Sequence, residues 1–125
     1  MGLDLIVREK SDFRLDEKGR NVYTTTELAN LRNCWNVLDS LNWRLDNDFE
    51  NCGTHYFYEG TFFKILKSFK EEVEIAKTEE NDEQVKQLKY EIGKLEAFIN
   101  ENGLQEFEDD DLEDDGREFE VHAWW

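Results

Sequence analysis

Apolar side chains recur at helical spacing over residues 61–103, the longest regular pattern in this chain. They step by three or four residues in the first half of the stretch and again in the second half. The two stripes are out of phase, because continuing the first one arrives at Glu80 and Glu83. We therefore predict two helices folded into an antiparallel hairpin. The predicted inward positions are Phe62, Leu66, Phe69, Val73 and Ala76, followed by Val85, Leu88, Ile92, Leu95 and Ile99.

A polar break at residues 78–82 separates the two expected helices. Asn81 can cap the second helix, and Gln84 stands three residues later, as in a capping box. Gly103 suits the end of that helix, and Leu104 after it can close the end with an apolar contact. One long bent helix, or a coiled coil formed by strand exchange between copies, stays open as an alternative.

Alternation of apolar and polar residues predicts strands near both ends of the chain. Residues 3–9 alternate in this way, and residues 13–15 and 21–23 flank a turn that contains Gly19, which is typical of a β-hairpin. The C-terminal residues 117–125 also alternate. Their apolar face holds Phe119, Val121, Ala123 and Trp125.

Two further elements are expected between these strands. The run from Thr24 to Glu27 has the form of a capping box and predicts a helix over residues 25–41. Residues 56–58 are expected to form a short strand after a turn at residues 51–53. The apolar face of the predicted helix would hold Leu28, Leu31, Trp35 and Leu38.

These elements together indicate an α+β fold. We expect a small, mostly antiparallel sheet packed with an N-terminal helix and an antiparallel helical hairpin. A chain of 125 residues can bury roughly two-thirds of the surface of its unfolded form, so residues 1–125 are expected to form a single domain. Within that domain an acidic segment, residues 104–118, precedes the C-terminal strand.

The net charge of the chain excludes some classes of binding partner. The net charge of −16 repels nucleic acid and anionic membranes and favours a basic protein partner. Residues 104–120 hold ten acids and the single base Arg117, which gives −9 of that total. The acids expected to contact a partner are Glu106, Glu108, Asp109, Asp110, Asp111, Glu113, Asp114 and Asp115.

This acidic run has two main interpretations. It is either a solvated loop, which is how blocks of like charge usually behave, or a surface that imitates the phosphates of nucleic acid. Duplex DNA carries about one charge per 1.7 Å of its axis, and a dense array of carboxylates on a rigid frame can occupy a nucleic-acid channel. Trp124 is expected to face outward beside the acids and to serve as an aromatic contact point.

The hypotheses of a metal site or an enzyme active site depend on fewer residues than the acidic run provides. Asp111, Glu113, Asp115 and Gly116 approximate a calcium loop, but His122 stands where a bidentate glutamate is required. Cys52 and His55 have the spacing of a zinc pair or of a nucleophile and its base. Cys34 and His122 would complete a set of four zinc ligands. We expect no cofactor and no metal, and a non-enzymatic protein.

The order of short motifs resembles that of a group of small phage and prophage proteins that begin Met-Gly-Leu-Asp. The residues that carry the resemblance are Met1 to Asp4, Leu31 to Asn33, Asn51 to Gly53, Tyr56, Tyr58, Leu66, Phe69 and the aromatic C-terminus. The likeness covers about half of the chain and brings no catalytic residues with it. It implies phage origin and an accessory role.

The sequence thus favours a phage-encoded acidic protein that inhibits a basic, nucleic-acid-handling host or defence protein, of the anti-restriction or anti-CRISPR type. Such a protein would act in the cytoplasm of the host, and the opening residues show no secretory signal. The alternatives are a small metal-dependent or cysteine-based enzyme, and a structural phage component in which the helical hairpin pairs two copies.

Overall fold

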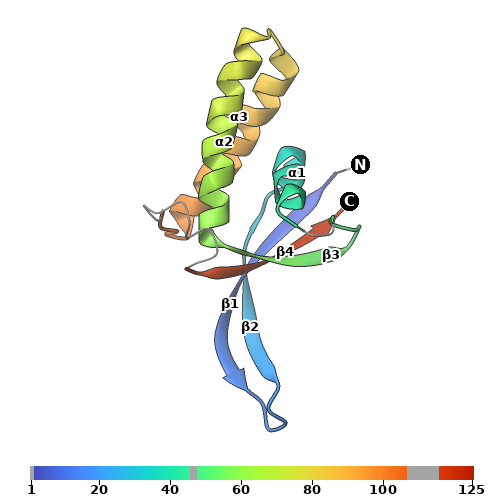
Figure 1. Ribbon diagram of the computed structural model, residues 1–125, viewed down its shortest axis with the longest axis vertical. Helices are drawn as coiled ribbons and strands as arrows, with labels where there is room; N and C mark the ends of the chain where they lie inside the picture. Colours follow the sequence, from blue (N-terminus) through green and yellow to red (C-terminus); the bar gives the residue numbers. More distant parts are fainter. Residues whose placement is uncertain (1, 46–47, 107–115) are drawn as a thin grey trace.

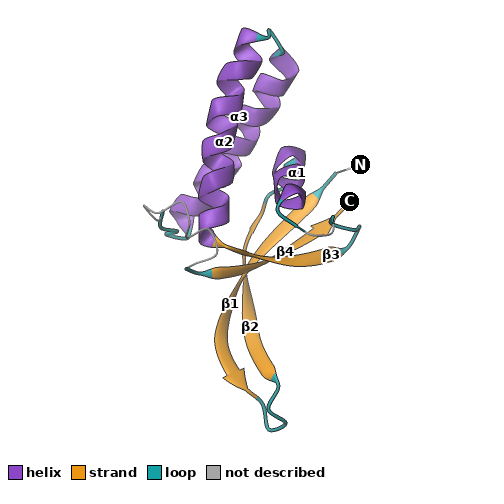
Figure 2. Ribbon diagram, in the orientation of Figure 1, coloured by secondary structure: helices purple, strands orange, loops and turns teal. Residues whose placement is uncertain are grey.

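One antiparallel sheet and three helices make up the computed structural model, which describes residues 2–45, 48–106 and 116–125. The strands lie in the order β2-β1-β4-β3 (Figures 1 and 2). The expected α+β class is therefore confirmed, together with the helical hairpin. In chain order the elements are β1 (Asp4–Leu15), β2 (Asn21–Asn30), α1 (Trp35–Trp43), β3 (Gly53–Tyr58), α2 (Glu59–Thr78), α3 (Asp82–Glu101) and β4 (Glu118–Trp124).

The helices cover one face of the sheet, and the α2-α3 hairpin rises from it (Figure 1). On the opposite side β1 and β2 continue as a two-stranded ribbon (Figure 2). This happens because β1 pairs with β4 only from Asp4 to Glu9, whereas it pairs with β2 as far as Leu15. The left-handed Asp12 (φ 54°) lies at a register shift of this ribbon, and Gly19 (φ 76°) closes its turn as expected.

Alternation along β1 and β4 divides the sheet into a buried and an uncovered face. The inward residues pack under the helices in the single hydrophobic core, while Trp125 is partly buried against it. The inward residues of these two strands and the residue before β1 are Leu3, Leu5, Val7, Phe119, Val121 and Ala123. Of the described helices, none is both long and apolar enough to span a bilayer.

The turn between α2 and α3 follows its sequence signals. The Asn81 side chain accepts a hydrogen bond from the backbone N–H of Gln84 at 3.3 Å. Gly103 takes a left-handed conformation (φ 63°) after α3, and the N–H of Leu104 donates to Ile99 O at 3.0 Å. Residues 79–81 separate the two helices, which pack against each other, so the single long helix is excluded.

The buried faces of the hairpin are rotated from the predicted ones. On α2, Ile65 is fully buried and Leu66 is only half-buried. On α3, Phe98 and Glu91 are buried, whereas Val85 and Ile92 are half-buried. The shift arises because α3 must pack against α1 as well as α2, and sequence periodicity cannot show that second neighbour.

The predicted N-terminal helix is present, but the first part of its predicted range, residues 25–41, is wrong. Residues 21–30 form β2, and the helix α1 runs only over Trp35–Trp43. Three successive threonines, Thr24 to Thr26, read as a helix cap, but their branched side chains also suit a strand, and pairing with β1 satisfies their backbone groups. Trp35, expected on the inner helix face, is 41% exposed and packs against Trp125 instead.

The helix α1 begins without a cap of its own, because Cys34 at its N-cap position makes no side-chain hydrogen bond to the helix. Glu91 of α3 supplies that cap. Its carboxylate is fully buried and accepts hydrogen bonds from Val37 N–H at 2.9 Å, Asn36 Nδ2 at 2.7 Å and Gln87 Nε2 at 3.0 Å. The positive end of the helix dipole and these donors compensate the buried charge. Burial nevertheless raises the pKa of this carboxyl, and the hydrogen bonds oppose that rise.

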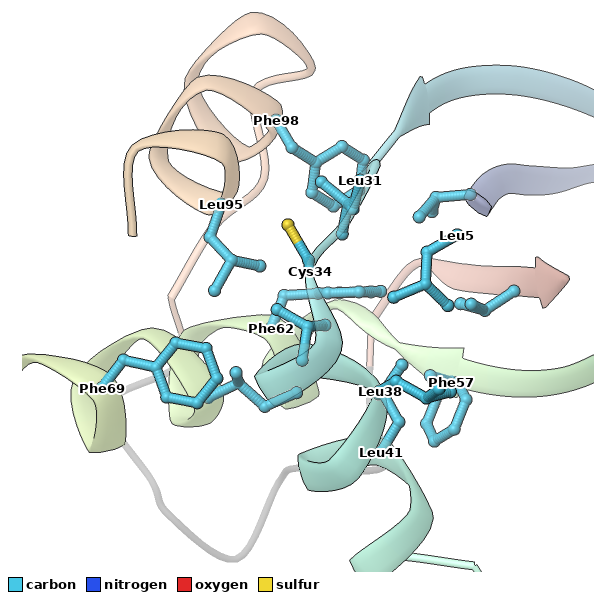
Figure 3. Close-up of a cluster of buried hydrophobic side chains, with 14 of the residues drawn as sticks. Leu5, Leu31, Cys34, Leu38, Leu41, Phe57, Phe62, Phe69, Leu95 and Phe98 are labelled. Atoms are coloured by element: carbon cyan, nitrogen blue, oxygen red, sulfur yellow. The ribbon is translucent and has the colours of Figure 1, made fainter. Parts of the chain in front are cut away.

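Two neighbouring side chains of α3 hold the segment that leads into α1. Gln87 Nε2 also donates to Asn33 O at 3.0 Å, and Tyr90 Oη donates to Arg32 O at 2.6 Å. Below them Cys34 lies among Leu31, Leu95, Phe98 and Phe62 (Figure 3). One side of α3 therefore anchors both the entry to α1 and its first turn.

We expect Glu91→Ala to lower the free energy of unfolding by about 3 kcal/mol, because it leaves the buried N–H of Val37 unpaired and opens a cavity. Urea unfolding followed by circular dichroism measures this loss. The matched control is Glu101→Ala, an exposed acid of the same helix, which should change stability by less than about 0.5 kcal/mol. Equal effects of the two substitutions would contradict the capping role.

Candidate partner-binding surface

The face of the sheet that the helices leave uncovered carries aromatic side chains. Trp124 at the end of β4 is 55% exposed, and Tyr56 of β3 is 50% exposed. Partly buried Ile6 and His122 pair across β1 and β4 on the same face, and Thr54 Oγ1 lies 2.8 Å from His122 Nδ1. Exposed aromatic rings on a hydrogen-bonded sheet are suitable anchors for a protein interface.

A lysine and three aromatic rings form a compact cluster on this face. The Nζ atom of Lys10 lies 4.2 Å from the ring centroid of Tyr23 and 4.3 Å from that of Tyr56. It also forms a 2.9 Å ion pair with Glu118, and Phe13 packs on Tyr23 at 6.0 Å. The hydroxyls of Tyr23 and Tyr56 are hydrogen-bonded at 3.2 Å. The cluster ties β2, β1, β4 and β3 together and fixes the orientation of Tyr56.

The acidic segment leaves and re-enters the fold at one buried carboxylate. Glu59, the first residue of α2, is 4% exposed. Its Oε2 accepts from the N–H of Gln105 at 3.2 Å, and its Oε1 accepts from the N–H of Arg117 at 3.0 Å. Residues 105 and 117 are thus joined by one side chain. We call this arrangement, Glu59 with Gln105 and Arg117, the neck of the acidic segment.

The side chain of Arg117 binds the neck to β1 and to the residue that follows α3. Its Nε and Nη2 donate to the two carboxylate oxygens of Glu9 at 2.6 and 2.7 Å, and its Nη1 donates to Asn102 O at 2.7 Å. This two-point ion pair lowers the pKa of Glu9, since the hydrogen bonds from Arg117 stabilise the carboxylate. One arginine therefore links β1, the end of α3 and the start of β4.

The predicted contact residues divide between described and undescribed parts of the chain. Glu106 is exposed directly beyond the neck, and Trp124 is exposed on the uncovered sheet face. The other predicted contact residues lie outside the described residues. They are Glu108, Asp109, Asp110, Asp111, Glu113, Asp114 and Asp115.

The four suggested zinc ligands do not converge. Cys34 is buried beside α3, whereas Cys52 is exposed. His55 packs its ring edge against Phe49, at 4.5 Å between centroids, on the helical side of β3, and His122 faces the uncovered side. Within residues 2–45, 48–106 and 116–125 there is no group of three or more side chains able to hold a metal ion. Three acids of the suggested calcium loop, Asp111, Glu113 and Asp115, fall outside those ranges.

No protein-family model, curated protein or solved structure gives a significant match to this chain.

Sequence reasoning missed the residues that build the neck. Glu59 lies where β3 gives way to α2, and Arg117 is the lone base of the acidic run. The available signal was that single base: an isolated arginine among ten acids is the expected partner of a fixed carboxylate. Its contacts with residues 9, 59 and 102 are too distant in sequence to be read from spacing.

We expect Glu59→Ala to speed amide hydrogen exchange at Gln105 and Arg117 about tenfold, because each N–H loses its acceptor. Exchange measured by nuclear magnetic resonance gives both rates. Glu71→Ala, an exposed acid on the same helix, is the control and should leave them unchanged. Exchange at both positions that does not respond to Glu59→Ala would show that the carboxylate does not hold the neck.

The two thiols should differ in reactivity, because only the thiolate is nucleophilic. Burial raises the pKa of Cys34 to about 12, and the charge of Glu91 adds to that rise. We expect iodoacetamide at pH 8 to alkylate Cys52 in the folded protein and to reach Cys34 only in urea. Peptide mapping by mass spectrometry measures the two sites. Equal labelling of both in the native protein would contradict the burial of Cys34.

Proposed function

We propose that this protein is an acidic inhibitor that binds the basic, nucleic-acid-handling surface of another protein and competes there with nucleic acid. Its net charge of −16 provides attraction to such a surface. The acidic segment supplies the densest block of that charge, and its carboxylates take the place of phosphates.

The neck is the observation that carries this proposal. A solvated acidic tail would not need its two ends joined, whereas a surface presented to a partner benefits from a fixed base. The Glu59 carboxylate and the Arg117 guanidinium bind both ends of the segment to the fold through hydrogen bonds of 2.6 to 3.2 Å. A fixed base lowers the entropy that the segment loses when it binds.

The uncovered sheet face adds an aromatic contact to the charged one. Strand β4 starts directly after the neck and ends at Trp124. Its seven residues span about 20 Å at the usual rise of a strand. The neck and the exposed ring of Trp124 thus lie at opposite ends of one strand. In this arrangement charge supplies approach and register, and the aromatic side chain supplies affinity.

The resemblance to small phage proteins narrows the class of partner. A phage accessory protein that binds basic surfaces meets host or defence proteins that handle nucleic acid, such as restriction or CRISPR effectors. We therefore assign the protein to the anti-restriction or anti-CRISPR type of inhibitor as part of the same proposal.

The proposal predicts binding that is sensitive to salt and to competing DNA. Immobilised protein should retain partners from a host lysate at 50 mM salt and lose most of them at about 500 mM, because salt screens charge contacts. Added duplex DNA should also displace the retained partners, since both occupy the same surface. Retention that is indifferent to salt and to DNA would exclude mimicry.

A matched pair of variants distinguishes binding by the acidic segment from binding that depends only on the net charge of the protein. The test variant combines Glu108→Gln, Asp109→Asn, Asp110→Asn and Asp111→Asn. The control removes four exposed acids elsewhere and combines Glu17→Gln, Glu50→Gln, Glu71→Gln and Glu101→Gln. We expect the test variant to bind at least about tenfold more weakly than the control, which corresponds to one lost charge-assisted contact. Equal loss in both would assign the binding to net charge.

A further inference from the structure

A cleft of about 300 Å³ lies between α1 and the outer half of the α2-α3 hairpin. It is separate from the neck and from the uncovered sheet face, since neither shares a lining residue with it. Buried Phe69, Ala76 and Leu88 form its apolar part, and Ile75 stands at its edge with 57% of its surface exposed. The remaining lining residues are Asn36, Asp39, Ser40, Glu72, Glu79, Asn81 and Gln84.

All charged side chains that line the cleft are negative. Asp39, Glu72 and Glu79 are exposed carboxylates, and the lining includes no lysine or arginine. Some carboxylates elsewhere are paired: Asp4 pairs with Arg32, and Glu118 with Lys10. The three acids of the cleft form no ion pair with any residue of the described chain. A cationic group would therefore complement the cleft without displacing an existing partner.

The neutral groups of the cleft suit a planar cation. Asn36 uses its amide nitrogen to bind Glu91, which leaves its side-chain oxygen as an acceptor. Phe69 and Ile75 offer apolar surface to the methylene stem of a long side chain. A guanidinium group combines a flat face for apolar packing with several in-plane donors for carboxylates and amides. An ammonium group is more strongly hydrated and lacks this geometry.

The walls of the cleft are held in place before any ligand arrives. Glu91 binds the first turn of α1 through Val37 and Asn36, and this fixes α1 against α3. Asn81 caps α3 at the far end of the cleft. Fixed walls reduce the ordering that binding would otherwise require.

We propose that this cleft receives an arginine side chain from the basic partner. The proposal rests on the proposed function for the presence of a basic partner, and it adds a third contact surface to the acidic segment and the uncovered sheet face. The charge of the lining, the apolar surface within the cleft and its volume together define the occupant as an arginine on an exposed segment.

Three peptides test the cleft on the full-length protein. The probes are acetyl-Gly-Arg-Gly-amide, the same peptide with lysine, and the same peptide with citrulline, which is neutral but close to arginine in shape. We expect the arginine peptide to shift the backbone amide resonances of Asp39, Ile75, Glu79 and Gln84, the lysine peptide to do so more weakly, and citrulline not at all. Shifts of equal size with citrulline, or shifts only outside the cleft, would overturn the inference.

A matched pair of double variants makes the test specific. Asp39→Asn with Glu72→Gln should weaken binding of the arginine peptide about tenfold, the loss of one charge-assisted hydrogen bond. Glu17→Gln with Glu101→Gln removes the same charge elsewhere and should leave the peptide affinity unchanged. Equal weakening by both pairs would overturn the inference, because it would assign the binding to net charge.

The same cleft variants distinguish this inference from the proposed function. In the lysate experiment they should reduce retention of the partner, while the salt and DNA dependence persists. Unchanged retention would overturn the role of the cleft in partner binding and leave the acidic segment as the contact. If instead the unsubstituted protein binds the arginine peptide in the cleft, but its retention of the partner does not depend on salt or DNA, the proposed function is overturned.

Discussion

The Glu91 carboxylate is the interaction on which the placement of the helices depends. It sits where α1, α3 and the segment leaving β2 meet, and it accepts three hydrogen bonds within a fully buried environment. The short helix α1 has no cap of its own, so its free N–H groups require this acceptor. Without it, this nine-residue helix would depend mainly on apolar contacts such as those of Val37, Leu38 and Leu41. The cleft beside α1 has fixed walls for the same reason.

Glu59, at the first residue of α2, repeats this arrangement. Both are buried acids in a chain with a large excess of acids, and both bind backbone N–H groups from segments distant in sequence. Each joins two parts of the fold that few apolar contacts connect: α1 with α3, and the two ends of the acidic segment. Because the donors are backbone groups, the acids hold particular positions of the chain as well as neutralising charge.

The remaining acids have a different role, because most of them face solvent. Their surface is not uniform: on the uncovered sheet face Lys10 pairs with Glu118, whereas the three acids that line the cleft pair with no residue of the described chain. In the proposed complex, a basic partner would therefore be attracted to the unpaired acids of the cleft. This uneven distribution of paired and unpaired charge gives the proposed binding its orientation.

Local patterns determined the helical hairpin, its Asn81 and Gly103 caps, the ribbon turn at Gly19 and the terminal strands, because each depends on residues within a few positions of one another. The tertiary structure decided the rest. Residues 24–30 carry both helix and strand signals, and only pairing with β1 selects the strand. Glu91 lies on α3 beside other charged residues, and only the approach of α1 makes it buried. The neck and the cleft join residues up to 108 positions apart in the sequence, and no spacing rule reaches that far, since such contacts arise from packing and not from periodicity.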